Sequence, residues 1–172
     1  MKTILLAEDS EDDVFFFNRA LRQVDPACSV RVVINGLQVI DYLSGSGIYA
    51  NRKFFPMPSI VILDLKLPCL NGIEALQWIR GQDEFRGLPV IMLTGSNEAR
   101  DINGAYHLGV NSYFVKPSDP SKFTEMLRSI HQYWFEFGNL PTLQSSVSVT
   151  ETTTELDAQP QPLHSGQMCG EE

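Results

Sequence analysis

The sequence is poor in the features that mark secreted, membrane-spanning and zinc-binding proteins. Its three cysteines are far apart and lack CxxC spacing, which argues against a disulfide framework or a zinc site. No apolar run approaches the roughly 18 residues that a membrane span needs. The N-terminus predicts no secretory signal, because only four apolar residues separate Thr3 from Glu8. We therefore expect a soluble, cytoplasmic protein without a membrane partner.

Basic residues are also scarce. There are 13 Lys and Arg against 21 Asp and Glu, giving a formal net charge of −8. Direct nucleic-acid binding is not expected, because it needs a basic surface to displace counterions from phosphates. Residues 141–172 hold five acids and no base and are rich in Ser, Thr, Gln and Pro. This composition predicts a disordered acidic tail after a single domain at residues 1–140.

The first 140 residues contain five short apolar runs with helical periodicity between them. Such runs are typical of strands buried on both faces of a parallel sheet. Five strands alternating with five helices specify a three-layer α/β domain, with helices on both faces of the sheet. The predicted strands are Thr3–Ala7, Val30–Ile34, Ile60–Leu63, Val90–Leu93 and Ser112–Val115.

The first and last helices carry start and stop signals. Ser10 predicts an N-cap, with Asp13 as a capping-box-like acid, and Pro26 ends that helix. The last helix is predicted to begin at Asp119-Pro120, a cap followed by proline, and to stop before Leu140-Pro141. Its predicted inward stripe is Phe123, Met126, Leu127, Ile130, Trp134 and Phe137, and the residues partly outside the stripe are Tyr133 and Phe135.

Polar side chains follow four of the predicted strands, at the sheet edge where open parallel sheets bind ligands. Three crowded carboxylates repel one another unless a cation shares them, and carboxylate oxygens suit Mg²⁺. A carboxylate beside such a metal can attack phosphorus, while a lysine and a hydroxyl neutralise the transferred group. The pattern therefore predicts an aspartyl phosphate site. The residues are Glu8 and Asp9, then Asp64, Thr94 and Lys116-Pro117.

Each of these residues alone has a simpler explanation. The acid pair could stabilise a helix start, and Asp64 could be a turn residue. Thr94 could satisfy a backbone group, and Lys116 could be a solvated strand end. Their joint placement at one edge of one sheet favours the catalytic interpretation.

Four segments resemble the signature blocks of response-regulator receivers, which accept phosphoryl groups in two-component signalling. The resemblance covers about residues 1–137 and implies a flavodoxin-like, doubly wound sheet with strand order 2-1-3-4-5. It also implies Mg²⁺-dependent transfer from a sensor histidine kinase or a phosphotransfer protein. The segments are Ala7-Glu8-Asp9-Ser10, Ile62–Pro68, Leu93-Thr94-Gly95 and Tyr113-Phe114-Val115-Lys116-Pro117.

The resemblance assigns the metal and phosphate ligands. Asp64 matches the phospho-acceptor. Glu8 and Asp9 match the acidic pair, with Asp9 the direct Mg²⁺ ligand and Glu8 acting mainly through water. Lys66 matches the position whose backbone carbonyl binds the metal. The phosphate-contacting pair corresponds to Thr94 and Lys116.

The resemblance also implies a switch. Thr94 moves toward the phosphate, and the aromatic residue at the Tyr113 position turns inward behind it; an ordinary sheet tyrosine is the alternative. Pro117 matches a proline usually preceded by a cis bond. We expect the fourth helix, fifth strand and fifth helix to form the signalling face and a possible homodimer contact. An aromatic plug that closes the domain would equally explain the exposed C-terminal aromatics.

The connection at residues 45–58 and the aromatic segment Tyr133–Phe137 are similar to the small regulators paired with bacterial phytochrome histidine kinases. The polar tail is too short for an output module, so we expect a stand-alone receiver. Phe15 points away from the apolar face of the first helix. Phe15 and Phe16 are therefore predicted to dock the kinase, with packing against a loop as the alternative.

Two other functions compete with this prediction. A phosphatase or phosphotransferase of the dehalogenase type would carry a second Asp two residues after its nucleophile, where this sequence has Lys66. A degenerate receiver could serve as a plain interaction module, although every site residue is present. We expect a signalling protein whose only catalysis is its own phosphorylation and dephosphorylation, rather than an enzyme.

Overall fold

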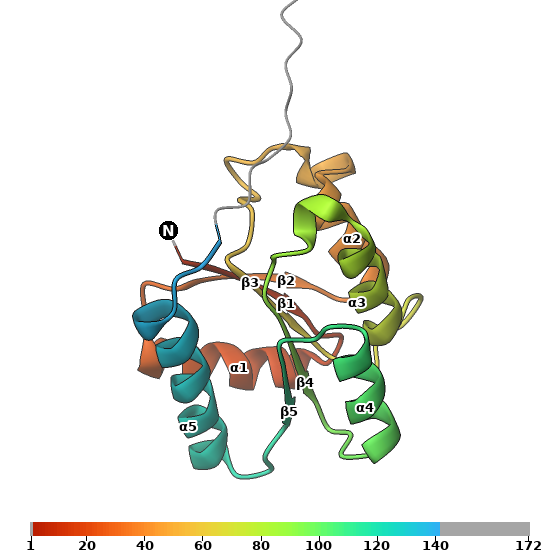
Figure 1. Cartoon of the computed structure of the whole chain (residues 1–172). Helices are drawn as coiled ribbons and strands as arrows, with labels where there is room; N and C mark the ends of the chain where they lie inside the picture. Colours follow the sequence, from red (N-terminus) through yellow and green to blue (C-terminus); the bar gives the residue numbers. More distant parts are fainter. Residues whose placement is uncertain (1, 142–172) are drawn as a thin grey trace, which may run out of the picture.

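The computed structural model describes residues 2–141 and shows a five-stranded parallel sheet between two layers of helices (Figure 1). The strand order is β2-β1-β3-β4-β5, as the resemblance implies. The tail predicted at 141–172 lies outside the described residues except for Pro141. The strands are β1 (Thr3–Ala7), β2 (Ser29–Val33), β3 (Ile60–Leu63), β4 (Val90–Thr94) and β5 (Ser112–Val115).

Three strands have the predicted bounds, and two differ by one residue. β2 begins and ends one residue earlier than predicted, because Ser29 pairs with Thr3 at the start of β1. β4 continues to Thr94, which pairs with Val115 of β5. This last pair brings the threonine and the end of β5 to the same sheet edge.

The five helices cover the two faces of the sheet unequally (Figure 1). α1 and α5 pack together on one face, while α2, α3 and α4 cover the other. No helix among residues 2–141 is long and apolar enough to cross a membrane. The helices are α1 (Glu11–Val24), α2 (Gly36–Ser44), α3 (Gly72–Gly81), α4 (Ala99–His107) and α5 (Pro120–His131), with short 3-10 turns η1 (Gly47–Ala50) and η2 (Asp83–Phe85) and a π-helix η3 (Gln132–Phe137).

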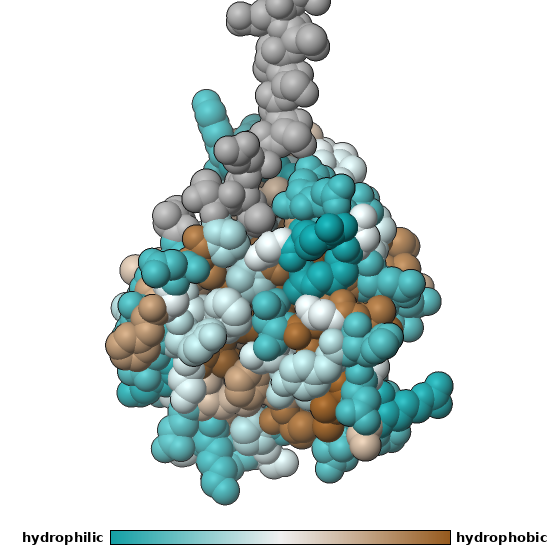
Figure 2. All heavy atoms as spheres, viewed as in Figure 1, coloured by the Kyte–Doolittle hydropathy of each residue, from teal (hydrophilic) through white to brown (hydrophobic). Residues whose placement is uncertain are grey.

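Alternation of side chains along the inner strands divides the core into two clusters. In β3, Val61 and Leu63 face the cluster under α2 and α3, whereas Ile60 and Ile62 face the cluster under α1 and α5. The inner strands β1, β3 and β4 are buried throughout, whereas the edge strands β2 and β5 are partly exposed. The buried inner strands fix the positions of their carboxyl ends, which form one edge of the sheet. On the face of the molecule that Figure 2 shows, apolar side chains appear in groups among hydrophilic ones.

The start of α1 confirms half of the predicted capping box. The Ser10 hydroxyl accepts a hydrogen bond from the Asp13 amide at 3.3 Å, so Ser10 is the N-cap. The reciprocal half is wrong. The Ser10 amide donates to Glu8 Oε1 at 3.2 Å, and the Asp13 carboxylate turns instead to Lys116. The Asp13 carboxylate therefore pairs with Lys116 and does not cap its own helix.

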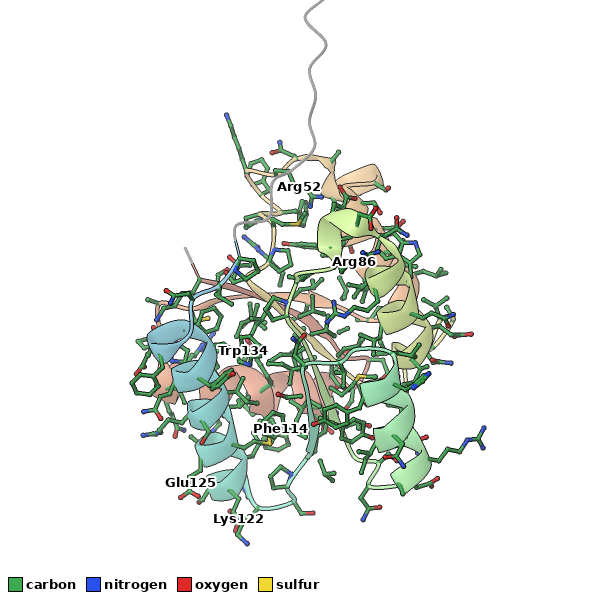
Figure 3. All side chains as sticks on the ribbon, viewed as in Figure 1. Arg52, Arg86, Phe114, Lys122, Glu125 and Trp134 are labelled. Carbon is green, nitrogen blue, oxygen red and sulfur yellow. The ribbon has the colours of Figure 1, made fainter. Side chains whose placement is uncertain are left out.

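The C-terminal end of the last helix differs from the predicted inward stripe. α5 changes at Gln132 into a π-helix, whose wider turn shifts the facing of every later side chain. Phe135 consequently packs against the core with Trp134, while Phe137 is 79% exposed. The inward placement predicted for Phe137 is therefore wrong, and so is the more outward placement of Phe135. Trp134 and Phe114 lie between this helix and the sheet (Figure 3).

The connection between α2 and β3 is held by one arginine. Arg52 donates to the Tyr42 carbonyl at 2.7 Å and to the Leu43 carbonyl at 2.6 Å, at the C-terminal end of α2 (Figure 3). The Tyr42 hydroxyl in turn donates to the Pro56 carbonyl at 2.8 Å. Because helix C-termini carry unpaired carbonyls, the guanidinium both caps α2 and fixes the path of residues 45–58.

Candidate active site

The predicted site residues meet at the carboxyl ends of four strands. Ala7 pairs with Leu63 between β1 and β3, so Glu8 and Asp64 emerge side by side. The Lys116 amide donates to the Thr94 carbonyl at 2.8 Å, which brings the end of β5 beside the end of β4. The structure thus brings together all four segments that the sequence predicted for this edge.

Three carboxylates form the floor of the site. Glu8, Asp9 and Asp64 each offer an oxygen, and these oxygens lie within 4.8 Å of one another. In an octahedral Mg²⁺ site with ligands at about 2.1 Å, opposite ligands are at most about 4.2 Å apart. Small movements of the three side chains would therefore bring their oxygens within reach of one ion. The donor set is the hard-oxygen kind that Mg²⁺ prefers. Lys66 has an exposed side chain, and its amide donates to Asp64 Oδ1 at 3.3 Å.

Lys116 supplies positive charge to two of these carboxylates and to Asp13. Its Nζ lies 2.5 Å from Glu8 Oε2, 2.6 Å from Asp13 Oδ2 and 3.2 Å from Asp64 Oδ2. Burial alone would lower the pKa of Lys116, but the hydrogen bonds to Asp13 and Glu8 and the charge of Asp64 outweigh burial and raise it. The lysine therefore remains a cation at any physiological pH.

Glu8 is the most enclosed acid of the group. Burial raises the pKa of Glu8, and the hydrogen bond and charge of Lys116 offset only part of that effect. The charge of neighbouring Asp64 raises the pKa further. The site thus holds more negative charge than one lysine compensates, which favours binding of a second cation.

Thr94 and Tyr113 are joined through Ser96. The Ser96 amide donates to Thr94 Oγ1 at 3.4 Å, and the Tyr113 hydroxyl donates to the Ser96 carbonyl at 3.1 Å. The Ser96 hydroxyl donates to Asp101 Oδ2 of α4 at 2.6 Å. A short hydrogen-bonded chain therefore connects the predicted phosphate-binding threonine to β5 and to α4.

A half-open groove of about 490 Å³ runs from the site between α1 and α5. Asp13, Phe16, Lys116 and Pro117 are among its lining residues. Phe15 is 62% exposed and meets Phe16 edge to face with ring centroids 5.7 Å apart. The exposure of Phe15 contradicts the alternative that a neighbouring loop covers it.

Comparison with known proteins identifies the family. The response regulator receiver domain matches residues 4–128. This chain is a response-regulator receiver. The receiver is 31% identical over 140 residues to the response regulator Rcp1 of Synechocystis, covering 81% of this chain and 93% of Rcp1.

Solved structures of response regulators have the same fold as this receiver. The phosphorylated cyanobacterial phytochrome response regulator RcpA is 31% identical, with a TM-score of 0.76, covering 82% of this chain and 99% of RcpA. Regulator RPA3017, from red light signalling in R. palustris, is 34% identical, with a TM-score of 0.79 and coverage of 83% and 99%. The Mn²⁺-bound form of Rcp1 is 31% identical, with a TM-score of 0.75 and coverage of 83% and 100%.

Two residues of the receiver's site were not predicted from the sequence as site residues. Asp13 was predicted as a helix cap because it lies three residues after Ser10, and only the fold brings it to Lys116. Ser96 is buried, with its polar groups bonded to four neighbours. Its position two residues after Thr94, on the loop leaving a predicted strand, was the one available signal.

Proposed function

We propose that this receiver accepts a phosphoryl group from a histidine kinase onto Asp64 and relays the change through α4, β5 and α5. The observation that carries the proposal is the position of the Lys116 ammonium, 3.2 Å from Asp64 Oδ2 at the edge of a carboxylate cluster. A nucleophilic carboxylate needs such a cation to stabilise the negative charge of the transferred group.

Glu8, Asp9 and Asp64, with the backbone carbonyl of Lys66, would hold Mg²⁺. When bound, the ion supplies positive charge to the phosphoryl oxygens and removes the repulsion among the acids. The Mn²⁺-bound form of a relative at 31% identity supports a divalent cation in this site. The metal-ligand roles are themselves part of the proposal.

In the proposed reaction, an Asp64 carboxylate oxygen forms a bond to phosphorus as the bond from phosphorus to the donor breaks. Lys116 donates hydrogen bonds to the phosphoryl oxygens, and Thr94 supplies a hydroxyl donor after its side chain moves toward the phosphate. Water later attacks the same phosphorus atom, the bond from phosphorus to the Asp64 oxygen breaks, and inorganic phosphate leaves with the carboxylate restored. The rate of this hydrolysis sets the lifetime of the signal, and the reaction serves signalling rather than metabolism.

The proposed switch uses the chain of contacts from Thr94 through Ser96 to Tyr113. Movement of the Thr94 hydroxyl toward a phosphate would break its contact with the Ser96 amide. Ser96 would then shift, and with it the carbonyl that accepts the hydrogen bond from Tyr113. Pro117, whose preceding bond is expected to be cis, would fix the direction in which Lys116 enters the site. α4, β5 and α5 would then change their exposed surface for a partner or for a second copy of the chain.

The proposed donor is a sensor kinase, and a bacterial phytochrome kinase is favoured because this chain resembles the cyanobacterial phytochrome response regulator RcpA. Phe15 and Phe16 are the proposed docking contacts, because both are exposed beside the groove that leads to Lys116. Replacing Phe15 by Ala should slow transfer from the kinase and leave phosphorylation by acetyl phosphate unchanged. Equal kinase transfer in both proteins would remove the docking role.

The direct test is intact mass after incubation with Mg²⁺ and acetyl phosphate. We expect one acid-labile phosphoryl adduct on wild type, none on Asp64→Asn and none after EDTA treatment. Beryllofluoride binding in the presence of Mg²⁺ provides the second measurement, because some receivers do not react with small donors. Absence of both signals would leave the protein an interaction module on a receiver fold.

A further inference from the structure

Asp13 stands at the third position of α1, where an acidic side chain commonly reaches back to the N-cap amide. In this chain Glu8 makes that contact, with its Oε1 3.2 Å from the Ser10 amide. The Asp13 carboxylate is free for another contact and lies 2.6 Å from the ammonium of Lys116, 103 positions away. The position of this side chain is therefore set by the site rather than by its own helix.

The ammonium of Lys116 has three N–H donors, and three carboxylates surround it. Its contact with Asp64, at 3.2 Å, is longer than its contact with Asp13, at 2.6 Å. The cluster suited to a metal ion contains Glu8 and Asp64 but not Asp13. Among the residues that the structure describes, Asp13 is thus the one ion-pair partner of Lys116 that is neither the phospho-acceptor nor a candidate metal ligand.

We propose that Asp13 is a positioning residue that holds the Lys116 ammonium toward α1 and competes for it with the phosphoryl group on Asp64. The inference rests on the proposed phosphotransfer function. A phosphoryl oxygen needs one of the three donors of Lys116, and a retained Asp13 carboxylate keeps another directed away from it. The negative charge of Asp13 also opposes an approaching phosphate anion. Asp13 therefore restrains both the capture and the retention of phosphoryl groups.

The test compares Asp13→Asn with wild type at saturating Mg²⁺. Asparagine keeps the size and one acceptor oxygen of the side chain but removes its charge. We expect beryllofluoride to bind about two- to fivefold more tightly, and acetyl phosphate to react about two- to fivefold faster, the range for a partly exposed ion pair. The ¹⁵N resonance of Lys116 Nζ should also shift, because its hydrogen-bond partner changes.

Two variants make the comparison specific. Asp12→Asn makes the same charge change on the adjacent, exposed residue, which makes no ion pair with Lys116, and should behave like wild type. Asp13→Glu restores a carboxylate and should return the binding constant and rate toward wild type.

Equal values for Asp13→Asn and Asp12→Asn would overturn the inference, as would weaker binding or slower reaction in Asp13→Asn. Failure of wild type to bind beryllofluoride and to form an adduct is a different result. It would remove the proposed function, and this inference with it. The results that overturn only the inference leave a working receiver in which Asp13 has no such role.

Discussion

The Tyr113 hydroxyl donates a hydrogen bond to the Ser96 carbonyl at 3.1 Å, joining β5 to the loop that follows β4. Burial raises the pKa of Tyr113, so the hydroxyl stays protonated and able to donate throughout the physiological range. Since Ser96 also contacts Thr94 and Asp101, the Tyr113 bond ties β5 to the residue that connects the site with α4. The switch role proposed for Tyr113 depends on that link.

Replacing Tyr113 by Phe should make the loop from Ser96 to Asp101 open more often, without creating a large cavity, because the aromatic ring is kept. A hydrogen bond of this kind contributes about 1 kcal/mol, so amide hydrogen exchange in that loop should accelerate by about fivefold. Exchange measured by mass spectrometry would check this, with Tyr133→Phe as the control at an exposed tyrosine. Equal acceleration in both variants would contradict a specific link.

Replacing Gly72 by Ala should strongly destabilise the fold beside the phospho-acceptor. A Cβ at Gly72 would lie 2.1 Å from the Asp64 carbonyl oxygen, so α3 would have to move away from the end of β3. We expect a loss of about 2 kcal/mol or more in the free energy of unfolding, measured by urea denaturation.

Gly104 of α4 provides the matched control for Gly72. A Cβ there meets no heavy atom within 4 Å apart from its chain neighbours and the backbone of its own helix, and Gly104→Ala should stabilise α4 by about 0.5–1 kcal/mol. Similar effects from the two substitutions would show that the close approach of Gly72 to Asp64 has no energetic consequence.

Divalent cations should stabilise the folded state through the carboxylate cluster. At ten times its dissociation constant, Mg²⁺ should add about 1.4 kcal/mol to the free energy of unfolding. Asp9→Asn should abolish most of this gain at little cost in the absence of the ion, because the Asp9 side chain is exposed and bonds to no other described residue. Thermal unfolding with Mg²⁺, or with NaCl at equal ionic strength, measures the difference. An undiminished gain in the variant would place the ion elsewhere.

Asp25 should contribute to the acid sensitivity of the protein. Its Oδ2 lies 3.1 Å from Lys2 Nζ and 2.9 Å from His131 Nε2. The hydrogen bond from Lys2 is the main cause that lowers the pKa of Asp25 below 3.8. A lowered pKa means that the stabilisation is complete above about pH 4 and is lost as the pH falls through the folded-state pKa.

Replacing Asp25 by Asn should therefore lower the free energy of unfolding at neutral pH, by about 1 kcal/mol, and flatten its slope below pH 4. Denaturant unfolding at a series of pH values between 2 and 7 measures both effects. Asp41→Asn, on the exposed side of α2, is the control. An acid profile identical to wild type would exclude a role for Asp25.

The inner architecture could be predicted because it depends on local patterns. The bounds of β1, β3 and β5 follow from short apolar runs, and the Ser10 cap follows from one residue type before a helix. The end of α5 could not be predicted, because the helix changes there into a π-helix that leaves Phe135 partly buried against the core and Phe137 exposed. Simple periodicity assumes a constant 3.6 residues per turn.

The site residues likewise include some that could be predicted from the sequence and one that could not. Asp64, Glu8 and Lys116 were predicted to share one edge because parallel strands present their carboxyl ends together. The role of Asp13 could not be predicted, because whether an acid caps its helix or pairs with a distant lysine depends on the distance between α1 and β5 in the folded chain.

The order of the strands also has a consequence for synthesis on the ribosome. β1 lies inside the sheet between β2 and β3, and all three precede β4 and β5 in the chain. At about 5–20 residues per second, the nascent chain carries Asp64 for several seconds before Lys116, 52 residues later, is made. During that interval the nascent chain contains the acid of this ion pair without the lysine that pairs with it in the folded domain.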